Sequence, residues 1–269
     1  MSIDGGLITT LQQIINDKSN ESDIDYTITQ FLLKNLYNEK ISASKISDEC
    51  HTSIASITRF AQNLGYTGFS DFKKEFDLLR FEKQEMQIDL KVFNKNKNQS
   101  KTNSTDLLHD EMKNVGKVFT NYIEEIDLKM IERLADLIHE ADKVIIYSIL
   151  IPGNLSLILQ NMLLTAGKYV EYFSNTEHQF NSSKTLSKND LTLFISLEGS
   201  HIMNKELTLS VTESEATNVL ITHNPEMKLG SLFDYIFPLG DHDIERSGKY
   251  KLLVLIEYLS HYYFKKYSI

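Results

Sequence analysis

The sequence predicts two domains, a small α-helical one followed by an α/β domain whose parallel sheet is flanked by helices. Three observations support this. Residues 3–80 carry helical periodicity almost throughout and no convincing strand. The stretch 94–105 has no large apolar side chain, so it cannot bury enough surface to fold. From residue 143 onward, short β-rich runs alternate with helical segments, which is typical of a parallel sheet.

These changes of pattern place the domain boundaries. We expect a helical domain over 1–80, a linker over 81–106 and an α/β domain over 107–269. A solvated loop inside one domain is the alternative explanation for the linker.

Composition excludes several classes of protein. The 269 residues are 41% hydrophobic and 24% charged, which is ordinary globular usage. No apolar run approaches the ~20 residues that span a bilayer, and the amino terminus lacks the pattern of a secretory signal. A single cysteine, Cys50, cannot form an internal disulfide, and no Cys/His cluster has zinc-ligand spacing. We therefore expect a cytoplasmic protein without metal, cofactor or membrane partner. The net charge of −9 argues mildly against non-specific nucleic-acid binding, although a local basic face can override it.

Apolar spacing predicts the individual elements. In the first domain, a helix carries Ile28, Phe31, Leu32 and Leu36 on one stripe, and further helices are expected near 44–50, 53–64 and 69–80. In the second domain, helices are expected over 107–126, 128–140, 155–165 and 249–266. The expected strands are 144–147, 169–173, 191–196, 219–222 and 235–238.

The segment 41–66 has the pattern of two short helices joined by a tight turn at His51-Thr52. Ser53 is a plausible N-cap of the second helix, and Gly65 ends it where a positive φ is wanted. One face of that helix is apolar: Ile54, Ile57, Phe60 or Ala61, and Leu64. The other face is small, polar and once basic: Ser53, Ala55, Ser56, Arg59, Gln62 and Asn63. This pattern favours a helix-turn-helix that enters the DNA major groove, but a structural helical hairpin shares it.

The same segment closely resembles the RpiR-type helix-turn-helix of bacterial regulators, over roughly residues 25–78. The matching positions are Ser53, Ser56, Ile57, Arg59, Phe60, Leu64, Gly65, Tyr66, Gly68, Phe69 and Lys73. The family usually has glycine where this chain has His51, a side chain that tolerates left-handed backbone. The resemblance implies a transcriptional regulator that binds double-stranded DNA.

The implied DNA contacts fall into two groups. We expect Ser53, Ser56, Arg59 and Asn63 to contact the major groove or its flanking phosphates. Lys45, Lys73 and Lys74 are expected on phosphates, although each also fits a solvated surface charge. Arg59 is the strongest candidate, because arginine can bind a guanine edge or a phosphate through two hydrogen bonds. A homodimer or higher oligomer would bind an inverted repeat.

The order of elements over about 110–269 resembles the sugar isomerase (SIS) domain that follows this helix-turn-helix in the same regulators. That resemblance implies a phosphosugar held by loops after the parallel strands. In the first loop, 147–156, Ser148 and Leu150 replace the family's two glycines. The second loop keeps Ser196 and Gly199 but has Glu198 and His201 where hydroxyls are expected. The candidate effector-binding residues are Ser148, Gly153, Asn154, Ser196, Glu198, Gly199, Ser200, His201 and Ser247.

The sequence thus favours a regulator of carbohydrate metabolism genes whose second domain dimerises and senses a metabolite. Because Glu198 would repel a phosphate, we expect sugar phosphates to bind weakly, and an amine-bearing derivative or no effector to be more compatible. The many apolar residues of Tyr250–Phe264 predict dimerisation through the last helix. One alternative is a SIS-fold sugar-phosphate isomerase or lyase, with His201 and Glu198 as acid–base pair. Another is a second domain that only dimerises.

Overall fold

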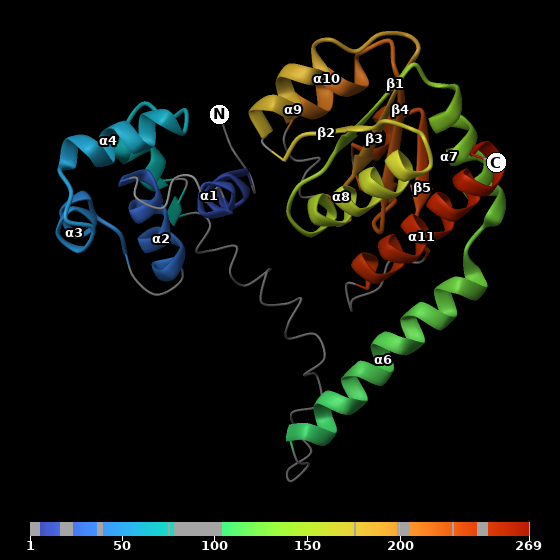
Figure 1. Ribbon diagram of the computed structural model, residues 1–269, viewed down its shortest axis with the longest axis horizontal. Helices are drawn as coiled ribbons and strands as arrows, with labels where there is room; N and C mark the ends of the chain where they lie inside the picture. The colour runs from blue at the N-terminus through green and yellow to red at the C-terminus, as the bar shows by residue number, and fades with distance from the viewer. Residues whose placement is uncertain are drawn as a thin grey trace. The chain divides into compact units, whose positions relative to one another are not determined.

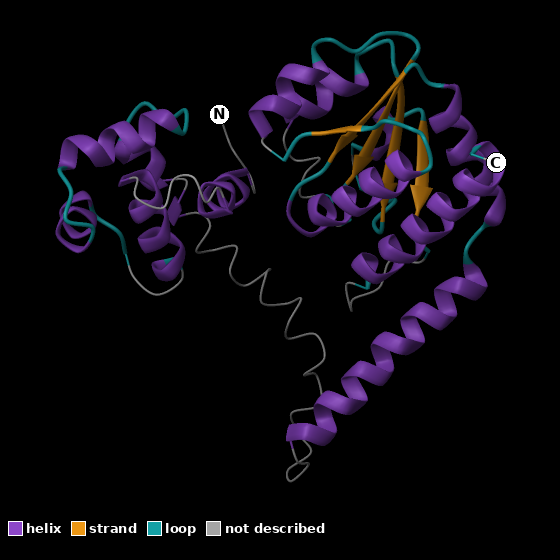
Figure 2. Cartoon of the chain, in the orientation of Figure 1, coloured by secondary structure: helices purple, strands orange, loops and turns teal. Residues whose placement is uncertain are grey.

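The chain forms two compact units, Met1–Leu90 and Lys91–Ile269 (Figures 1 and 2). The computed structural model describes residues 6–16, 24–36, 40–74, 76–77, 104–174, 176–197, 199, 205–227, 229–240 and 247–268. Most of the expected linker, 81–103, lies outside these ranges, and its last residues already belong to a helix that begins at Ser104. Within the same ranges, no helix is long and apolar enough to span a bilayer.

The described part of the amino-terminal unit is entirely helical. Its helices are α1 (Gly6–Asn16), α2 (Ile24–Asn35), α3 (Ala43–Glu49) and α4 (Ile54–Asn63), and residues 69–74 are also helical. Ser42 caps α3, because its side chain accepts a hydrogen bond from the backbone N–H of Lys45. The helices enclose one apolar core that includes Leu11, Ile28, Leu32, Ile46, Ile57, Phe60 and Phe72.

The carboxy-terminal unit is a five-stranded parallel sheet with the order β2-β1-β3-β4-β5. Its strands are β1 (Lys143–Tyr147), β2 (Glu171–Tyr172), β3 (Asp190–Ile195), β4 (Thr217–Thr222) and β5 (Tyr235–Pro238). Its helices are α6 (Ser104–Glu125), α7 (Leu128–Glu140), α8 (Leu150–Thr165), α9 (Thr176–Ser183), α10 (Lys205–Thr212) and α11 (Gly248–Tyr267), with a short 3-10 turn at Gly230–Leu232. The predicted α/β class with helices on the sheet is confirmed.

Side chains alternate between the two faces of the sheet, and each face has its own core. On one face, Val144 and Ile146 of β1 join side chains of α7, α8 and α11. On the other face, Ile145 and Tyr147 join Leu207 and Val211 of α10. Strands covered on both sides are buried almost throughout and mostly apolar, which is why β1, β3 and β4 were recognisable as short β-rich runs.

Helix α11 is covered over most of its surface by its own subunit. It packs against α6, α7 and α8, and Leu252, Ile256 and Leu259 are fully buried. The apolar excess that predicted a partner surface on this helix is therefore explained by three intrachain neighbours. Phe264 is the exception, being 48% exposed. This packing does not test the expected dimerisation, which stays a prediction.

The expected first loop, 147–156, is much shorter than predicted. Helix α8 starts at Leu150, so only Ser148 and Ile149 separate it from β1. Pro152 fits within the first turn, because the N–H that proline lacks has no intrahelical partner there. Leu150 has φ +55°, a left-handed conformation at a position where the resembling family has glycine. The chain therefore keeps a glycine-type backbone without the glycine.

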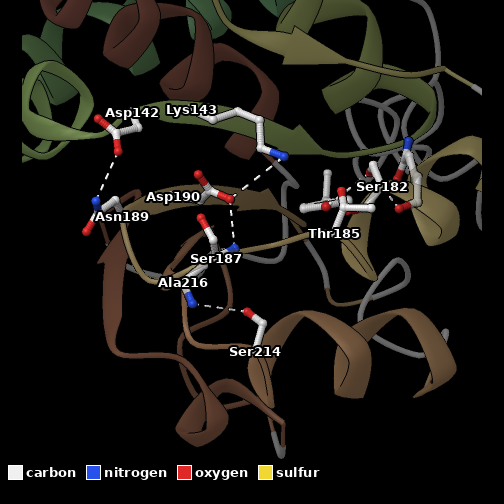
Figure 3. A network of polar contacts seen from close by, with 11 residues as sticks. Asp142, Lys143, Ser182, Thr185, Ser187, Asn189, Asp190, Ser214 and Ala216 are labelled. Atoms are coloured by element: carbon white, nitrogen blue, oxygen red, sulfur yellow. Dashed lines mark hydrogen bonds and ion pairs between the residues drawn. The ribbon is translucent and has the colours of Figure 1, made fainter.

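The amino ends of the strands are fastened by a polar network (Figure 3). The carboxylate of Asp190, at the start of β3, lies 3.7 Å from the ammonium of Lys143 and accepts a hydrogen bond from the backbone N–H of Ser187. The side chain of Asn189 donates to Asp142 over 3.0 Å. Ligand sites of parallel sheets lie at the carboxyl ends of the strands, so this network is structural.

A buried polar pair links the two central strands and gives a first prediction. The hydroxyl of Thr192 donates to the side-chain oxygen of Asn218 over 2.7 Å, and both residues are buried. Replacing Thr192 by valine removes the donor and leaves that oxygen unpaired, so Thr192→Val should lower the free energy of unfolding by about 1–3 kcal/mol. Urea denaturation followed by circular dichroism measures this change.

The matched control is Thr165→Val, which removes an exposed hydroxyl bonded to its own helix. We expect the control to change stability by less than about 0.5 kcal/mol. Equal effects of the two substitutions would show that the buried pair contributes nothing specific.

Candidate functional site

The turn between α3 and α4 has the backbone predicted for a helix-turn-helix. His51 has φ +49°, so the histidine adopts the left-handed conformation that glycine usually provides. Ser53 caps α4 by accepting a hydrogen bond from the backbone N–H of Ser56. At the other end, Gly65 has φ +89°, and the N–H groups of Gly65 and Tyr66 bond to the carbonyls of Gln62 and Ala61. Both ends of α4 are thus fixed by local hydrogen bonds.

A cluster of aromatic side chains packs against the buried side of α4. Phe60 of α4 meets Phe72 edge-on at 5.8 Å between ring centroids, and Tyr66 meets the same ring at 5.4 Å. Phe76 stacks on Phe72 at 5.8 Å. Because Phe60, Phe72 and Phe76 are fully buried, this cluster holds the helix rigidly while its opposite side stays exposed.

The residues expected to contact DNA differ in how exposed their side chains are. Ser53, Arg59, Asn63 and Lys74 are exposed, whereas Lys45 and Lys73 are half-buried. Ser56 is only 9% exposed, and its hydroxyl lies 3.0 Å from the hydroxyl of Ser53 and 3.4 Å from a guanidinium nitrogen of Arg59. Ser56 was expected on the exposed polar face, but it belongs to the capped first turn, where it positions Arg59 and Ser53.

Asn63 and Lys73, which were also expected to contact DNA, interact with carboxylates of the same unit. The amide of Asn63 donates to the carboxylate of Asp25 in α2 over 3.2 Å. The ammonium of Lys73 lies 2.6 Å from the carboxylate of Asp77. The first interaction joins α4 to α2, whereas the second links residues four positions apart on one helical segment, so a DNA contact by Asn63 or Lys73 would have to be shared with these carboxylates.

Ile54 departs from its prediction. We expected it on the apolar face of α4, but its side chain is 56% exposed, while Ile57 is fully buried. Ile54 is the first residue of the helix, where the protein core no longer reaches beneath the chain. The exposed surface of α4 is therefore less polar than the sequence indicated.

The candidate effector-binding residues are only partly described. Ser148, Gly153, Asn154, Ser196, Gly199 and Ser247 lie in the described ranges, and Glu198, Ser200 and His201 lie outside them.

The first described group lies around the start of α8. The Ser148 hydroxyl lies 2.8 Å from the Ser156 hydroxyl, and both side chains are fully buried. Burial raises the pKa of the Tyr172 phenol, and a hydrogen bond with Ser148 opposes that shift. A Cβ on Gly153 would lie 2.5 Å from the Tyr172 oxygen, so the glycine makes room for this ring. Ser148 therefore helps to build the loop and Gly153 packs inside the first turns of α8, while Asn154 is exposed on the same helix.

A second group gathers at the carboxyl ends of β3 and β4. Ser196 follows β3, and its buried hydroxyl has no hydrogen-bond partner among the described residues. His223 follows β4 and bonds through its backbone N–H to the carbonyl of Leu197. The His223 ring lies 3.3 Å from the ammonium of Lys251 in α11. The structure thus brings Ser196, His223 and Lys251 to one edge of the sheet.

Ser247 and Gly248 join this edge at the start of α11. Ser247 is 2% exposed, and a Cβ on Gly248 would lie 2.8 Å from the Cβ of His223. The close approach explains why glycine opens this helix. Gly199, with φ +93°, lies in the second loop near Met227.

Sequence reasoning missed His223 and Lys251. His223 was recognisable in principle, because it is the first residue after a predicted strand and such residues line the carboxyl edge of a parallel sheet. Lys251 carried no such signal, since a lysine in a long helix usually has its charge in solvent.

Known proteins resemble both units. Residues 8–78 match the model of the helix-turn-helix domain, rpiR family. An uncharacterized HTH-type transcriptional regulator of Haemophilus influenzae is 20% identical over 210 residues, covering 77% of this chain and 71% of that protein. The HTH-type transcriptional regulator GlvR of Bacillus subtilis is 27% identical over 196 residues, covering 70% of this chain and 67% of GlvR.

Solved structures show the same fold. The Vibrio vulnificus NanR protein complexed with ManNAc-6P aligns with a TM-score of 0.52 at 17% identity, over 96% of this chain and 92% of NanR. A protein of E. coli CFT073, determined as a ligand complex, aligns with a TM-score of 0.50 at 17% identity, over 61% of this chain and 93% of its own.

The family match covers the capped α3–α4 pair, and the relatives that align over most of this chain are regulators of the same type. The amino-terminal unit is therefore a helix-turn-helix domain of the rpiR family, and the chain is a DNA-binding transcriptional regulator in which this domain precedes a SIS-like α/β domain.

Proposed function

We propose that α4 is the helix that enters the major groove, with Arg59 as its principal base contact. The observation that carries this proposal is the exposed face formed by Ala55, Arg59 and Gln62, which are spaced four and three residues apart on a helix capped at both ends. The hydrogen bond to Ser56 holds the Arg59 guanidinium near the first turn. Lys74 is exposed and suits a phosphate contact, which positions the domain without reading sequence.

Arg59→Ala should weaken binding to the preferred operator by about 1–3 kcal/mol and relax the base preference at one position of each half-site. The operator is first selected from random DNA with the full-length protein, and fluorescence anisotropy then measures affinity at fixed salt. Arg133→Ala removes the same charge from the α/β unit and should leave affinity unchanged. An operator affinity that survives Arg59→Ala in a folded protein would remove Arg59 from this role.

We further propose that the regulator is a homodimer held by α6. Along this helix, apolar residues recur at spacings of four and three: Leu108, Met112, Val115, Phe119, Tyr122 and then Ile126 just beyond it. The last three pack on the core of their own subunit, but Leu108 and Met112 are 59% and 57% exposed. A stripe with this spacing is typical of helix pairing, so its exposed half fits the same helix of a second copy. Two-fold symmetry then requires an operator that is an inverted repeat.

The double variant Leu108→Glu/Met112→Glu should convert the dimer into a monomer at micromolar concentration, because paired helices would bury four carboxylates. Light scattering on the full-length protein measures the mass. Ile123→Glu is the matched control, since Ile123 is 47% exposed on the same helix outside the stripe. A double variant that stays dimeric would place the interface elsewhere.

For the carboxy-terminal unit, we propose a sensor that binds a carbohydrate derivative at the carboxyl edge of the sheet without converting it. NanR, which shares the fold, was determined with a sugar phosphate, and the similar proteins of Haemophilus influenzae and Bacillus subtilis are transcriptional regulators. The buried Ser196 hydroxyl and the Lys251 ammonium supply a donor and a positive charge at that edge. Such a regulator acts in the cytoplasm, where its operator is accessible.

Simple sugar phosphates should bind weakly, because Glu198 within about 4 Å of a phosphate would cost about 4 kcal/mol at an effective dielectric constant of 20. Isothermal titration calorimetry against hexose phosphates, pentose phosphates and amino sugars tests this. Glu198→Ser should tighten phosphate binding, whereas Glu215→Ser, which removes an exposed carboxylate after α10, should not. Micromolar binding of a sugar phosphate by the unmodified protein would contradict the expectation.

A further inference from the structure

The side chain of Ile54 lies outside the core formed by the described residues of the amino-terminal unit. In the described residues of the amino-terminal unit, two large apolar side chains are exposed, Ile24 at 47% and Ile54 at 56%. Ile24 begins α2, whereas Ile54 begins α4, the helix proposed to enter the major groove. A single exposed apolar residue is ordinary on a protein surface, so exposure alone does not indicate a function, and the position of Ile54 on α4 matters more.

The location of Ile54 is rigidly defined. It directly follows the cap residue Ser53, whose hydroxyl accepts from the backbone N–H of Ser56 and lies 3.0 Å from that residue's hydroxyl. The carbonyl of Ile54 accepts a hydrogen bond from the Thr58 hydroxyl over 3.0 Å. Isoleucine itself is branched at Cβ and has one strongly preferred χ1 rotamer in a helix. The side chain is therefore preorganised and loses little entropy when a partner covers it.

The neighbours of Ile54 match what the major groove presents. Residues at the amino-terminal end of such a helix reach the base edges, and Ile54 flanks the face that carries Ala55 and Arg59. The 5-methyl group of thymine is the apolar feature of a base edge in that groove. Covering an aliphatic side chain with this methyl removes apolar surface of both from water.

We propose that Ile54 reads the 5-methyl group of one thymine in each operator half-site, adjacent to the base read by Arg59. This proposal rests on the proposed role of α4 in the major groove. It assigns a specificity-determining role to a residue that the apolar pattern had placed in the core.

The test removes the methyl group alone. In an operator selected from random DNA by the full-length protein, each thymine of one half-site is replaced in turn by deoxyuridine, which keeps its hydrogen-bonding groups. We expect one replacement to weaken binding by about three- to fivefold, the effect of one buried methyl group. Ile54→Ala should weaken binding to the thymine operator and abolish the sensitivity to that replacement, as a coupled pair requires.

Ile24→Ala is the matched control and should keep both the affinity and the sensitivity to deoxyuridine. If Ile54→Ala retains the full deoxyuridine effect, or binds as tightly as the unmodified protein, the proposal is wrong. The experiment distinguishes the thymine contact from the proposed role of α4. If Arg59→Ala loses affinity and Ile54→Ala does not, the thymine contact alone is wrong. Unchanged affinity in both variants overturns the role of α4 as well.

Discussion

Burying both faces of a parallel sheet is the constraint on which the carboxy-terminal unit depends. Strands β1, β3 and β4 carry apolar side chains on both faces, so helices must cover both faces, and each connection has to return the chain to the same end of the sheet. All carboxyl ends consequently meet at one edge. That topology, and no local motif, is what brings Ser196, His223 and Lys251 together from two strands and a distant helix.

The amino-terminal unit meets a different requirement, because a helix with the role proposed for α4 must be firmly held and yet leave one side uncovered. Phe60 supplies the attachment through one ring that enters the aromatic cluster around Phe72. Hydrogen bonds at the two ends fix the rotation and length of α4. The exposed side chains of Ala55, Arg59 and Gln62 therefore lie outside the core, which is the condition for varying them without unfolding the domain.

The features fixed by local physics could be predicted from the sequence. Helix α7 has both predicted ends, the cap at Ser53 and the positive φ at Gly65 are present, and every predicted strand exists. Each depends on residues a few positions apart.

What depends on distant neighbours could not be predicted in the same way. Periodicity placed Ile54 inside and Ser56 outside, because it records spacing but not how far the core extends beneath the first turn. The apolar residues of α11 indicated that more than one side of this helix is buried. The sequence pattern does not show whether helices of the same chain or a second copy bury them. Lys251 was missed for the same reason, since its role is set by a histidine 28 positions away.

The left-handed backbone at Leu150 has a consequence for what the sheet edge can admit. A glycine at this position would have no side chain, so the backbone of the loop would be uncovered there. A leucine keeps the path of the chain but adds an isobutyl group beside it, at the cost of roughly 1–2 kcal/mol of backbone strain. If a ligand binds at the carboxyl ends of the strands as proposed, the size of the side chain at residue 150 would then limit how closely that ligand can approach this loop.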